Sequence, residues 1–281
     1  MKEQENKSII VVSWDGINMP LHYLLQDTTP NFDLFIFDYS GNNNQSQLTS
    51  IPVKYYHSQK TECKGDILQG IYNYCLQYNV NDFRYMGFLD DDICISISDL
   101  NKLLFTATIE NLDVFQASLT QDSYYHHRQF IHKPGYQILT TDWVEIMAPF
   151  YSSAIFFEAG KNFNRSISGT GIDVYLIPTV QRLLEKTNTA VVHAVQMKHC
   201  RPIRTDNRVF SNGKTNLIEI KELQKYCLEI IYNNPAKFEQ TFIDRVIKRN
   251  YVYGIPLKYK LKRIPLMLKN FYHFLVDASY R

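Results

Sequence analysis

Residues 84–93 read RYMGFLDDDI, and this stretch gives the clearest indication of the fold. Its first part, Tyr85–Leu89, is an apolar run with the length of a strand buried on both faces. Three consecutive carboxylates, Asp90, Asp91 and Asp92, follow the run directly. In parallel α/β sheets, ligands bind beyond the carboxyl ends of the strands. The stretch therefore predicts such a sheet, with a binding site at its edge.

Strands and helices alternate on both sides of this stretch. The elements predicted before it are strands at Ile9–Trp14, Asp33–Phe37 and Ile51–Tyr56, a short helix at Leu21–Leu25, a loop at Ser40–Ser50 and a helix at Gly65–Tyr78. The elements predicted after it are a helix at Asp99–Thr108 with Ser98 as its N-cap, and strands at Val114–Ser118 and Val191–Arg201. This alternation predicts an α/β domain whose mostly parallel sheet is flanked by helices.

The pattern changes to helices beyond about Asn212, with amphipathic segments at Glu219–Asn233 and Ala236–Lys248. The tail that follows carries basic residues among large apolar ones: Lys258, Lys260, Lys262, Arg263 and Lys269. Such a mixture is typical of segments that lie on anionic membrane surfaces. A helix packed back on the main domain explains it equally well. We therefore expect one domain over residues 1–211 and a helical, basic extension over residues 212–281.

Composition and charge narrow the classes of partner. The net charge of +2 on 281 residues gives no strong field for nucleic acid, which we do not expect as a partner. The five cysteines include no CxxC pair, so reduced thiols in a cytoplasmic protein are a better interpretation than a zinc site. There is no run of eighteen apolar residues. We expect the protein in the cytoplasm, or at the inner face of the membrane where its tail binds there.

The three aspartates are candidates for a metal site. In an extended segment, Asp90 and Asp92 point to one side and Asp91 to the other. Like carboxylates at short range repel unless a cation lies between them, and oxygen ligands favour Mg²⁺ or Mn²⁺. Such an ion would bind a diphosphate and stabilise the charge on a departing nucleotide. The alternative is a solvated acidic turn.

Further donor-side candidates follow from the same reasoning. Asp15 and Asp38 end two other predicted strands, so they are expected at the same edge of the sheet as the aspartate triplet. Lys64 opens a predicted helix, where its charge and the helix N-terminus could together bind a phosphate. A surface lysine is the alternative there.

Two carboxylates further along are candidates for acid–base chemistry. Asp173 follows two glycines in SISGTGIDVYLIP and could accept the proton of an acceptor hydroxyl, although an N-cap aspartate fits the pattern nearly as well. Glu145 lies within the apolar run WVEIMAP, so it needs a partner or a function. It could hold acceptor hydroxyls, act as the base itself, or form a buried ion pair.

Histidines occur in two segments. His193 and His199 lie in VVHAVQMKHCR, where an imidazole could complete a carboxylate metal site, and a core role is preferred for His193. The segment YYHHRQFIH brings His126, His127 and Arg128 together. A solvated basic turn is the preferred interpretation of that segment over a loop that contacts the acceptor or a phosphate.

Five segments occur in an order that resembles a known family: FLDDDI, FQASLT with YYHHR, DWVEIMAPFYS, GTGID and VVHAVQMKH. The family is labelled "lysine ketoglutarate reductase trans-splicing related" and is similar to GT-A type nucleotide-sugar glycosyltransferases. The resemblance covers roughly residues 9–205. It departs from the family pattern at Thr170, where a tryptophan is expected between the glycines, and in the aspartate that replaces the acidic-then-Glu order of the metal segment.

The resemblance implies a role for each candidate. The roles are metal or donor contacts for Asp90, Asp91 and Asp92, a third metal ligand for His199, the base of an inverting enzyme for Asp173, and an acceptor-pocket residue for Glu145. The implied function is a metal-dependent glycosyltransferase of GT-A fold. It would use Mn²⁺ or Mg²⁺ and move a sugar from a nucleoside-diphosphate sugar to a glycan or lipid-linked acceptor in surface polysaccharide synthesis.

Two other classes of function remain as alternatives. A metal-dependent nucleotidyl or phosphoryl transferase could also use clustered aspartates, but it would normally carry a Gly-rich phosphate loop with a lysine near the first strand. The segment WDGINMP is not such a loop. A non-catalytic module that binds a glycan or a nucleotide is the third hypothesis.

Overall fold

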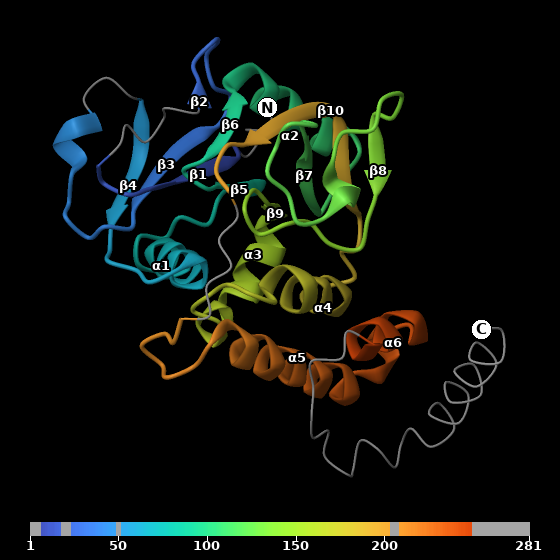
Figure 1. Ribbon diagram of the computed structural model, residues 1–281. Coiled ribbons are helices and arrows are strands. Elements are labelled where there is room, and N and C mark those ends of the chain that lie inside the picture. Colours follow the sequence, from blue (N-terminus) through green and yellow to red (C-terminus); the bar gives the residue numbers. More distant parts are fainter. Residues whose placement is uncertain (1–6, 18–23, 49–51, 203–207, 249–281) are drawn as a thin grey trace.

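The computed structural model describes residues 7–17, 24–48, 52–202 and 208–248, and a mixed sheet of ten strands runs through this part of the chain. The strands are β1 (Ile9–Trp14), β2 (Leu24–Leu25), β3 (Asp33–Asp38), β4 (Val53–Ser58), β5 (Tyr85–Leu89), β6 (Ile93–Ser96), β7 (Val114–Leu119), β8 (Ile138–Thr140), β9 (Phe150–Ser152) and β10 (Thr189–His199). Their order is β2-β6-β10-β7-β9-β5-β1-β3-β4, and β8 pairs with β10 beside this path (Figure 1).

The helices of the described residues are α1 (Lys64–Gln77), α2 (Ile97–Ile109), α3 (Ser153–Gly160), α4 (Ile177–Leu183), α5 (Asn216–Asn233) and α6 (Gln240–Lys248). Short 3-10 turns are η1 (Gln45–Leu48), η2 (Arg128–Phe130), η3 (Phe163–Arg165) and η5 (Pro235–Lys237), and η4 (Ile172–Leu176) is a π-helical turn. No helix among these described residues is long and apolar enough to cross a membrane.

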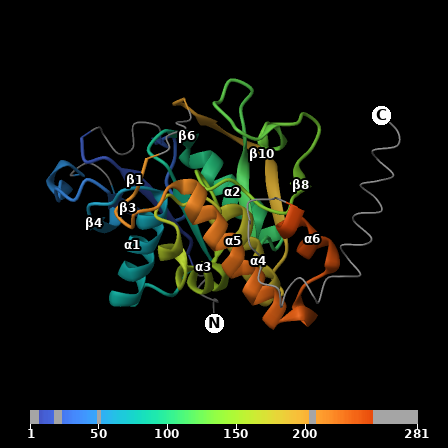
Figure 2. The same cartoon turned by 60° about the horizontal axis from the view of Figure 1, so that its bottom comes forward.

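The sheet separates two hydrophobic cores because successive side chains of a strand point to opposite faces. On β1, Ile10 and Val12 pack in the core that α2 covers, whereas Ile9 and Val11 pack in the core that α1, α3 and α4 cover. Helices α5 and α6 form an outer layer on the second face, where α5 contacts α4, η3 and η4 (Figures 1 and 2). The arrangement is an α/β fold with helices on both faces of a mixed sheet.

Parallel pairing dominates the part of the sheet that the sequence predicted. β1 pairs in parallel with both β3 and β5, β3 with β4, and β7 with β10. The short strand β9 lies antiparallel between β5 and β7. The carboxyl ends of β1, β3 and β5 therefore meet at one edge of the sheet.

Most predicted elements are confirmed. The strands Ile9–Trp14 and Tyr85–Leu89 have the predicted bounds, and the helices and other strands differ by a few residues at their ends. The short helix predicted at Leu21–Leu25 is wrong where it is described, because Leu24–Leu25 forms β2 and pairs in parallel with β6. Its first three residues lie outside the described part. The loop predicted at Ser40–Ser50 contains η1.

The N-cap of α2 is Ser96 rather than the predicted Ser98. The Ser96 hydroxyl accepts a hydrogen bond from the Asp99 backbone N–H at 3.0 Å, which is the contact an N-cap makes. Ser98 instead lies inside the helix, where its backbone N–H donates to the Asp27 carboxylate at 3.0 Å.

The predicted C-terminal extension is described as far as residue 248. Leu223, Cys227 and Ile231 of α5 are buried in the core that also contains Phe37 and Phe88 of the sheet. Helices α5 and α6 are thus packed on the sheet domain, and the division at residue 211 stays a proposal. The basic tail from Tyr251 lies outside the described residues.

Candidate functional site

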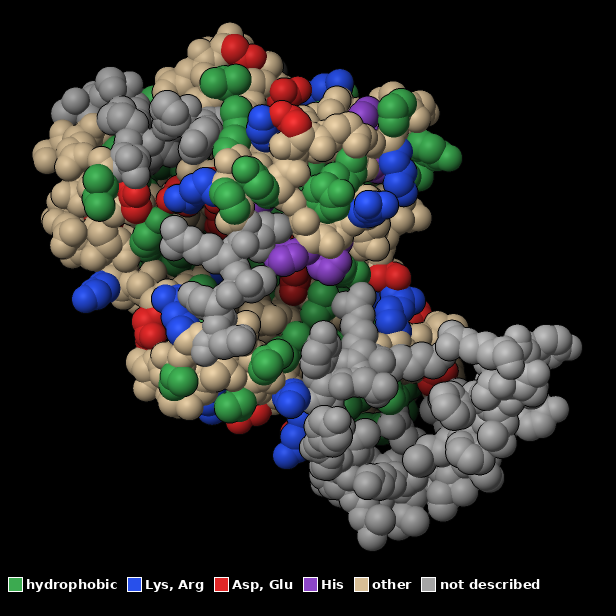
Figure 3. Space-filling view, in the orientation of Figure 1, with side chains coloured by type: hydrophobic (Ala, Val, Ile, Leu, Met, Phe, Trp, Pro, Cys, Tyr) green, Lys and Arg blue, Asp and Glu red, His purple; other side chains and the backbone are tan. Residues whose placement is uncertain are grey.

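A cavity of about 790 Å³ lies at the carboxyl ends of the central strands. Its acidic, basic and histidine lining residues are Glu62, Lys64, Asp90, Asp91, Asp92, His126, His127, Glu145, Asp173, His199 and Arg201. In the space-filling view, histidine side chains gather near the middle of the face, with acidic side chains recessed beside them (Figure 3). Seven predicted site residues therefore share one cavity: Lys64, Asp90, Asp91, Asp92, Glu145, Asp173 and His199.

Strand pairing brings the aspartates and Glu145 to the same place. β1 and β5 pair with Val12 opposite Leu89, so Ser13 of β1 lies beside Asp90, the first residue after β5. The segment after Glu145 runs along β5, where the Asp90 backbone N–H donates to the Met147 carbonyl at 3.0 Å. Glu145 is therefore placed beside the aspartate triplet by backbone hydrogen bonds.

The last strand brings His199 and Arg201 to the other side of the triplet. β10 pairs antiparallel with β6, with His199 opposite Ile93, and the Cys200 backbone N–H donates to the Asp92 carbonyl at 2.9 Å. Residues more than a hundred positions apart in the chain are thus in contact at the end of the sheet.

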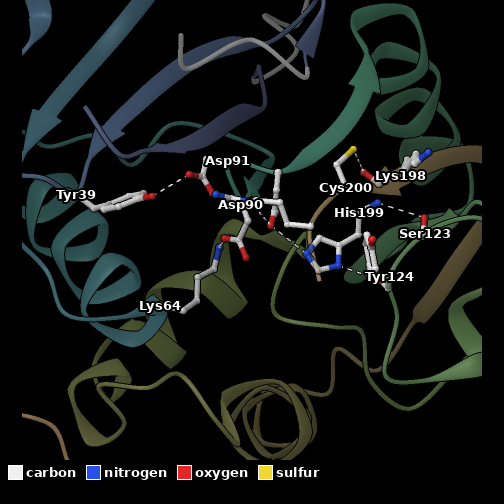
Figure 4. A network of polar contacts seen from close by, with 11 residues as sticks. Tyr39, Lys64, Asp90, Asp91, Ser123, Tyr124, Lys198, His199 and Cys200 are labelled. Carbon is white, nitrogen blue, oxygen red and sulfur yellow. Dashed lines mark hydrogen bonds and ion pairs between the residues drawn. The ribbon is translucent and has the colours of Figure 1, made fainter. Parts of the chain in front are cut away.

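Asp90 and Asp91 each have a basic or phenolic partner (Figure 4). The Lys64 ammonium donates to Asp90, and burial raises the pKa of Asp90 while the lysine opposes that rise. Asp91 accepts from the Tyr39 hydroxyl at 2.8 Å and from the Arg201 guanidinium. Burial and the Asp91 charge raise the pKa of Tyr39, so its hydroxyl stays protonated and remains a donor.

Asp92 meets His199 in a geometry suited to a metal ion. The His199 Nδ1 lies 2.9 Å from the Tyr124 carbonyl oxygen, and because a carbonyl can only accept, Nδ1 carries a proton. Nε2 lies 3.2 Å from Asp92 Oδ2, so it must carry a second proton or share a cation with that oxygen. Burial alone would lower the pKa of His199, but the Asp92 carboxylate outweighs it and raises that pKa.

The two oxygens of Asp92 differ in their hydrogen bonds. Its Oδ2 also accepts from Arg201 Nε at 2.9 Å, whereas its buried Oδ1 has no hydrogen-bond partner among the described residues. A metal-binding histidine usually donates one ring N–H to a backbone carbonyl or a carboxylate, which fixes the ring and leaves the other nitrogen to bind the metal. In His199, Nδ1 makes the backbone contact and Nε2 faces Asp92. The donor set of Asp92 and His199 therefore fits a divalent cation.

The three predicted metal ligands, Asp90, Asp92 and His199, do not surround a common position where one ion could bind. Within the described ranges, no three His, Cys, Asp or Glu side chains are placed to hold one ion. The triplet is a turn and not the extended segment that was predicted, since the Ile93 backbone N–H donates to the Asp90 carbonyl at 3.1 Å. Asp90 pairs with Lys64, whereas Asp92 pairs with His199.

Glu145 and Asp173 form a second acidic pair in the cavity. Glu145 is 7% exposed, and its Oε2 has no hydrogen-bond partner in the described part of the chain. Burial and the nearby Asp173 charge raise the pKa of Glu145 to about 8, so it is mostly a neutral acid at pH 7. Asp173 lies in the first turn of η4, where Oδ1 accepts from the Val174 N–H at 2.9 Å.

Two predicted donor contacts lie outside the cavity lining. Asp38 is fully buried, and its carboxylate accepts from Ser40, Tyr56 and Ser58 hydroxyls at 2.6–3.0 Å. It holds the loop after β3, and its predicted contact with a donor stays a prediction. Asp15 accepts from the Ile17 N–H at 2.9 Å, which closes the turn after β1.

Sequence reasoning missed Tyr39, Arg201 and Ser13, which line the cavity, and it preferred a solvated turn for the segment of His126 and His127. Arg201 could have been found, because it stands two residues after the predicted ligand His199. Nothing in the sequence around Tyr39 marks it as a site residue.

Comparisons with known proteins found similar structures but no similar sequences. No protein-family model and no curated protein matches the sequence, so the family resemblance drawn from the ordered motifs has no support there. The fold is similar to that of S. aureus TarS 1-349 in complex with UDP-GlcNAc, with a TM-score of 0.56 and 13% identity over 92% of this chain and 78% of that chain.

Other TarS structures give the same result. The complex of TarS 1-349 with UDP has a TM-score of 0.54 and 11% identity, over 86% of this chain and 69% of that one. For S. aureus TarS itself the TM-score is 0.56 and the identity 11%, over 88% of this chain but only 44% of that longer chain. These values show an α/β fold that resembles the GT-A fold of TarS.

Proposed function

We propose that this protein is a glycosyltransferase that moves a sugar from a uridine diphosphate sugar to a glycan or lipid-linked glycan acceptor, in surface polysaccharide synthesis. The observation that carries the proposal is the cavity that joins the aspartate triplet, two cationic side chains and the Glu145–Asp173 pair. Its volume of about 790 Å³ is in the range of sites for small organic ligands. The likeness of fold to TarS, crystallised with UDP-GlcNAc and with UDP, supports the choice of donor.

The diphosphate of the donor is assigned to Lys64 and Arg201. Both cations now pair with carboxylates, and both are of the type that binds phosphate oxygens. Lys64 is also the first residue of α1, whose N-terminal N–H groups favour an anion.

Mn²⁺ or Mg²⁺ is proposed to bind Asp92 and His199. Such ions often use one or two protein side chains and complete their coordination with phosphate oxygens and water, so a third protein ligand is not required. The bound ion would neutralise charge on the departing diphosphate. In its absence, the second proton on His199 and the guanidinium of Arg201 balance the Asp92 charge.

The acceptor is assigned to the side of the cavity that holds Glu145 and Asp173. Asp173 takes the proton of an acceptor hydroxyl while the hydroxyl oxygen attacks the anomeric carbon. The bond from that carbon to the diphosphate oxygen breaks, the nucleoside diphosphate leaves, and attack from the opposite side inverts the anomeric configuration. Glu145, as a neutral acid, donates a hydrogen bond to an acceptor oxygen.

Release of UDP from UDP-GlcNAc, other UDP-sugars and GDP-sugars, with and without Mn²⁺, tests the proposal. We expect Asp92→Asn to lower kcat/KM by about 10²-fold or more and to remove the metal dependence, since several kcal/mol of transition-state stabilisation are lost. Asp173→Asn should lower kcat similarly while UDP binding persists. Asp122→Asn is the control, because Asp122 is exposed and pairs with Lys198 outside the cavity lining.

Three outcomes contradict the proposal. Activity that survives both chelation and Asp92→Asn rejects the metal site. Release of a sugar 1-phosphate instead of a nucleoside diphosphate, with transfer of the nucleotidyl group, identifies a nucleotidyl transferase. Nucleotide binding with no turnover on any donor identifies a binding module.

We further propose that the basic tail holds the enzyme at the inner face of the membrane. Lys258, Lys260 and Lys262 stand among apolar residues, as in segments that bind anionic lipid. The full chain should sediment with vesicles that contain anionic lipid, more than a chain that ends at residue 248. Equal sedimentation of the two chains would reject the membrane role.

A further inference from the structure

A carboxylate from the C-terminal helix α5 holds the loop that forms one side of the cavity. The Glu219 side chain is fully buried, at the start of α5, and lies against the loop of residues 166–171. Its two oxygens accept four hydrogen bonds. The donors are Ile167 N at 2.9 Å and Asn212 Nδ2 at 2.8 Å to Oε1, and Ser168 N at 2.9 Å and Ser166 Oγ at 3.4 Å to Oε2.

These four donors are neutral, so in the described part of the chain dipoles stabilise the buried charge. Burial alone would raise the pKa of Glu219, but the hydrogen bonds from Ser168, Asn212 and Ile167 outweigh it and lower that pKa. Glu219 is therefore a carboxylate at neutral pH, and three of its four hydrogen bonds come from the loop.

The loop lies directly on the first turn of α1. The Gly65 backbone N–H donates to the Ile167 carbonyl at 3.0 Å. A Cβ on Gly65 would stand 1.6 Å from the Ser166 carbonyl oxygen, so only glycine permits this approach. Lys64, which pairs with Asp90, is the neighbouring residue.

The other end of the loop sets the start of η4. Gly171 has φ 92° and precedes η4, and the Ile172 N–H donates to the Gly169 carbonyl at 3.1 Å. Asp173 is the second residue of η4 and lines the cavity. The loop that Glu219 holds thus contacts the donor side of the cavity at Lys64 and carries Asp173 on the acceptor side.

We propose that Glu219 is a positioning residue that fixes Asp173 relative to the donor-side cations, so that helix α5 is part of the catalytic machinery. This inference rests on the proposed function for the role of Asp173. Helix α5 is held independently by Leu223, Cys227 and Leu228, which are buried in the core. The hydrogen bonds of Glu219 are therefore needed to hold the loop of residues 166–171 in place more than to hold helix α5 on the domain.

The variant Glu219→Gln tests the inference with little change of shape. The NH₂ group of the glutamine must face the backbone N–H of either Ile167 or Ser168, whichever way the amide is turned. One of these two hydrogen bonds is therefore replaced by a repulsive contact between two donors. Glu222→Gln is the matched control, because Glu222 lies on the same helix, is exposed and pairs with Lys214.

Hydrogen–deuterium exchange measures the loop directly and without turnover. In Glu219→Gln, exchange in a peptide covering residues 163–176 should rise at least about ten-fold, because one of the Ile167 and Ser168 amides loses its acceptor and the loop is held by fewer hydrogen bonds. Peptides from β1 and β5 should be unchanged, and Glu222→Gln should match the wild type throughout.

A double-mutant cycle then tests whether Glu219 acts through Asp173. We expect Glu219→Gln to lower the rate of UDP release from UDP-GlcNAc by about 10²-fold, as a misplaced catalytic group does. In an Asp173→Asn background it should change that rate by less than about two-fold, because the residue it positions is already lost. Binding of UDP with Mn²⁺, measured by calorimetry, should change by less than about three-fold.

The outcomes separate this inference from the proposed function. Unchanged exchange in the 163–176 peptide, or the same fold-loss of UDP release in both backgrounds, overturns the role of Glu219. A wild type that releases no UDP from any donor rejects the proposed function, while the exchange result still decides whether Glu219 holds the loop. Where Glu219→Gln does not fold, Glu219→Asp, which keeps the charge but shortens the reach, is measured with the same expectations.

Discussion

Glu145 shows how a buried segment sets the chemistry of one side chain. Its backbone N–H donates to Gln116 Oε1 at 2.6 Å, which fixes the residue, while its carboxyl group lies almost out of contact with solvent. The charge of Asp173 adds to the cost of ionising it. The surroundings of Glu145 thus keep it protonated at a pH where a carboxyl group in water is ionised, as they do for general acids in enzymes.

The stability of the ligand-free protein should depend on pH through Glu145. Its folded pKa of about 8 lies above the unfolded value of 4.5, so the folded state holds a proton that the unfolded state releases. Stability from this group is fully present below pH 4.5 and falls by up to about 1.4 kcal/mol per pH unit as the pH rises toward 8. In Glu145→Gln this loss should disappear.

Urea unfolding at pH 5 and pH 8 in the presence of a chelator measures the effect. The variant should lose less stability between the two pH values than the wild type. The same pH dependence in both proteins would show that Glu145 is ionised in the folded state.

At the residue scale, the sequence predicted site residues that are adjacent in the chain better than site residues that folding brings together from distant segments. Asp90, Asp91 and Asp92 were recognisable because they follow one another after a strand. Tyr39 and Arg201 reach the same aspartates only through the pairing of β3, β6 and β10, which no local pattern specifies. The burial of Asp38 could not be predicted, because the hydroxyls that surround it come from two separate segments.

At the element scale, the contact between α1 and the loop of residues 166–171 permits no side chain at Gly65. Alanine favours helices over glycine by about 1 kcal/mol, yet here its Cβ would overlap the Ser166 carbonyl oxygen. We expect Gly65→Ala to destabilise the protein by about 1–3 kcal/mol in urea unfolding, as overpacked sites do. Leu76→Ala, on the exposed face of the same helix, should change stability by no more than about 0.5 kcal/mol. Stability equal to the wild type in Gly65→Ala would show that the loop does not lie on α1 in solution.

Elements with a long apolar pattern were predicted well, and short ones were not. β1 and β5 are buried along their whole length, so their composition alone marks them. β2 and β9 have two and three residues, and they are strands only because neighbouring strands offer them hydrogen bonds. The antiparallel insertion of β9 between β5 and β7 therefore could not be predicted from the sequence.

At the scale of the whole molecule, the described part of the extension contributes to the core of the sheet domain. Leu223, Cys227 and Ile231 are buried together with residues of α1, α3 and β5. A chain that ends at residue 211 would expose the apolar surface beneath α5 and lose several side chains, each worth about 2–5 kcal/mol on removal from a core. That sum exceeds the usual stability of a domain.

We therefore expect a chain of residues 1–211 to lack a cooperative unfolding transition, whereas a chain of residues 1–248 unfolds cooperatively. Circular dichroism during thermal and urea unfolding compares the two. A cooperative transition of similar midpoint in both chains would establish residues 1–211 as an independent domain.

The position of β10 in the sheet has a consequence for how the protein is made. This strand is the last of the described strands but lies between β6 and β7, and it brings His199 and Arg201 to aspartates synthesised about a hundred residues earlier. The chain is synthesised from its N-terminus, so β6 and β7 leave the ribosome before β10 does. The edge of each strand that pairs with β10 stays unpaired until β10 is synthesised. A nascent chain that has not reached Arg201 therefore lacks the complete cavity, and a product terminated before that residue is expected to be inactive in the proposed reaction.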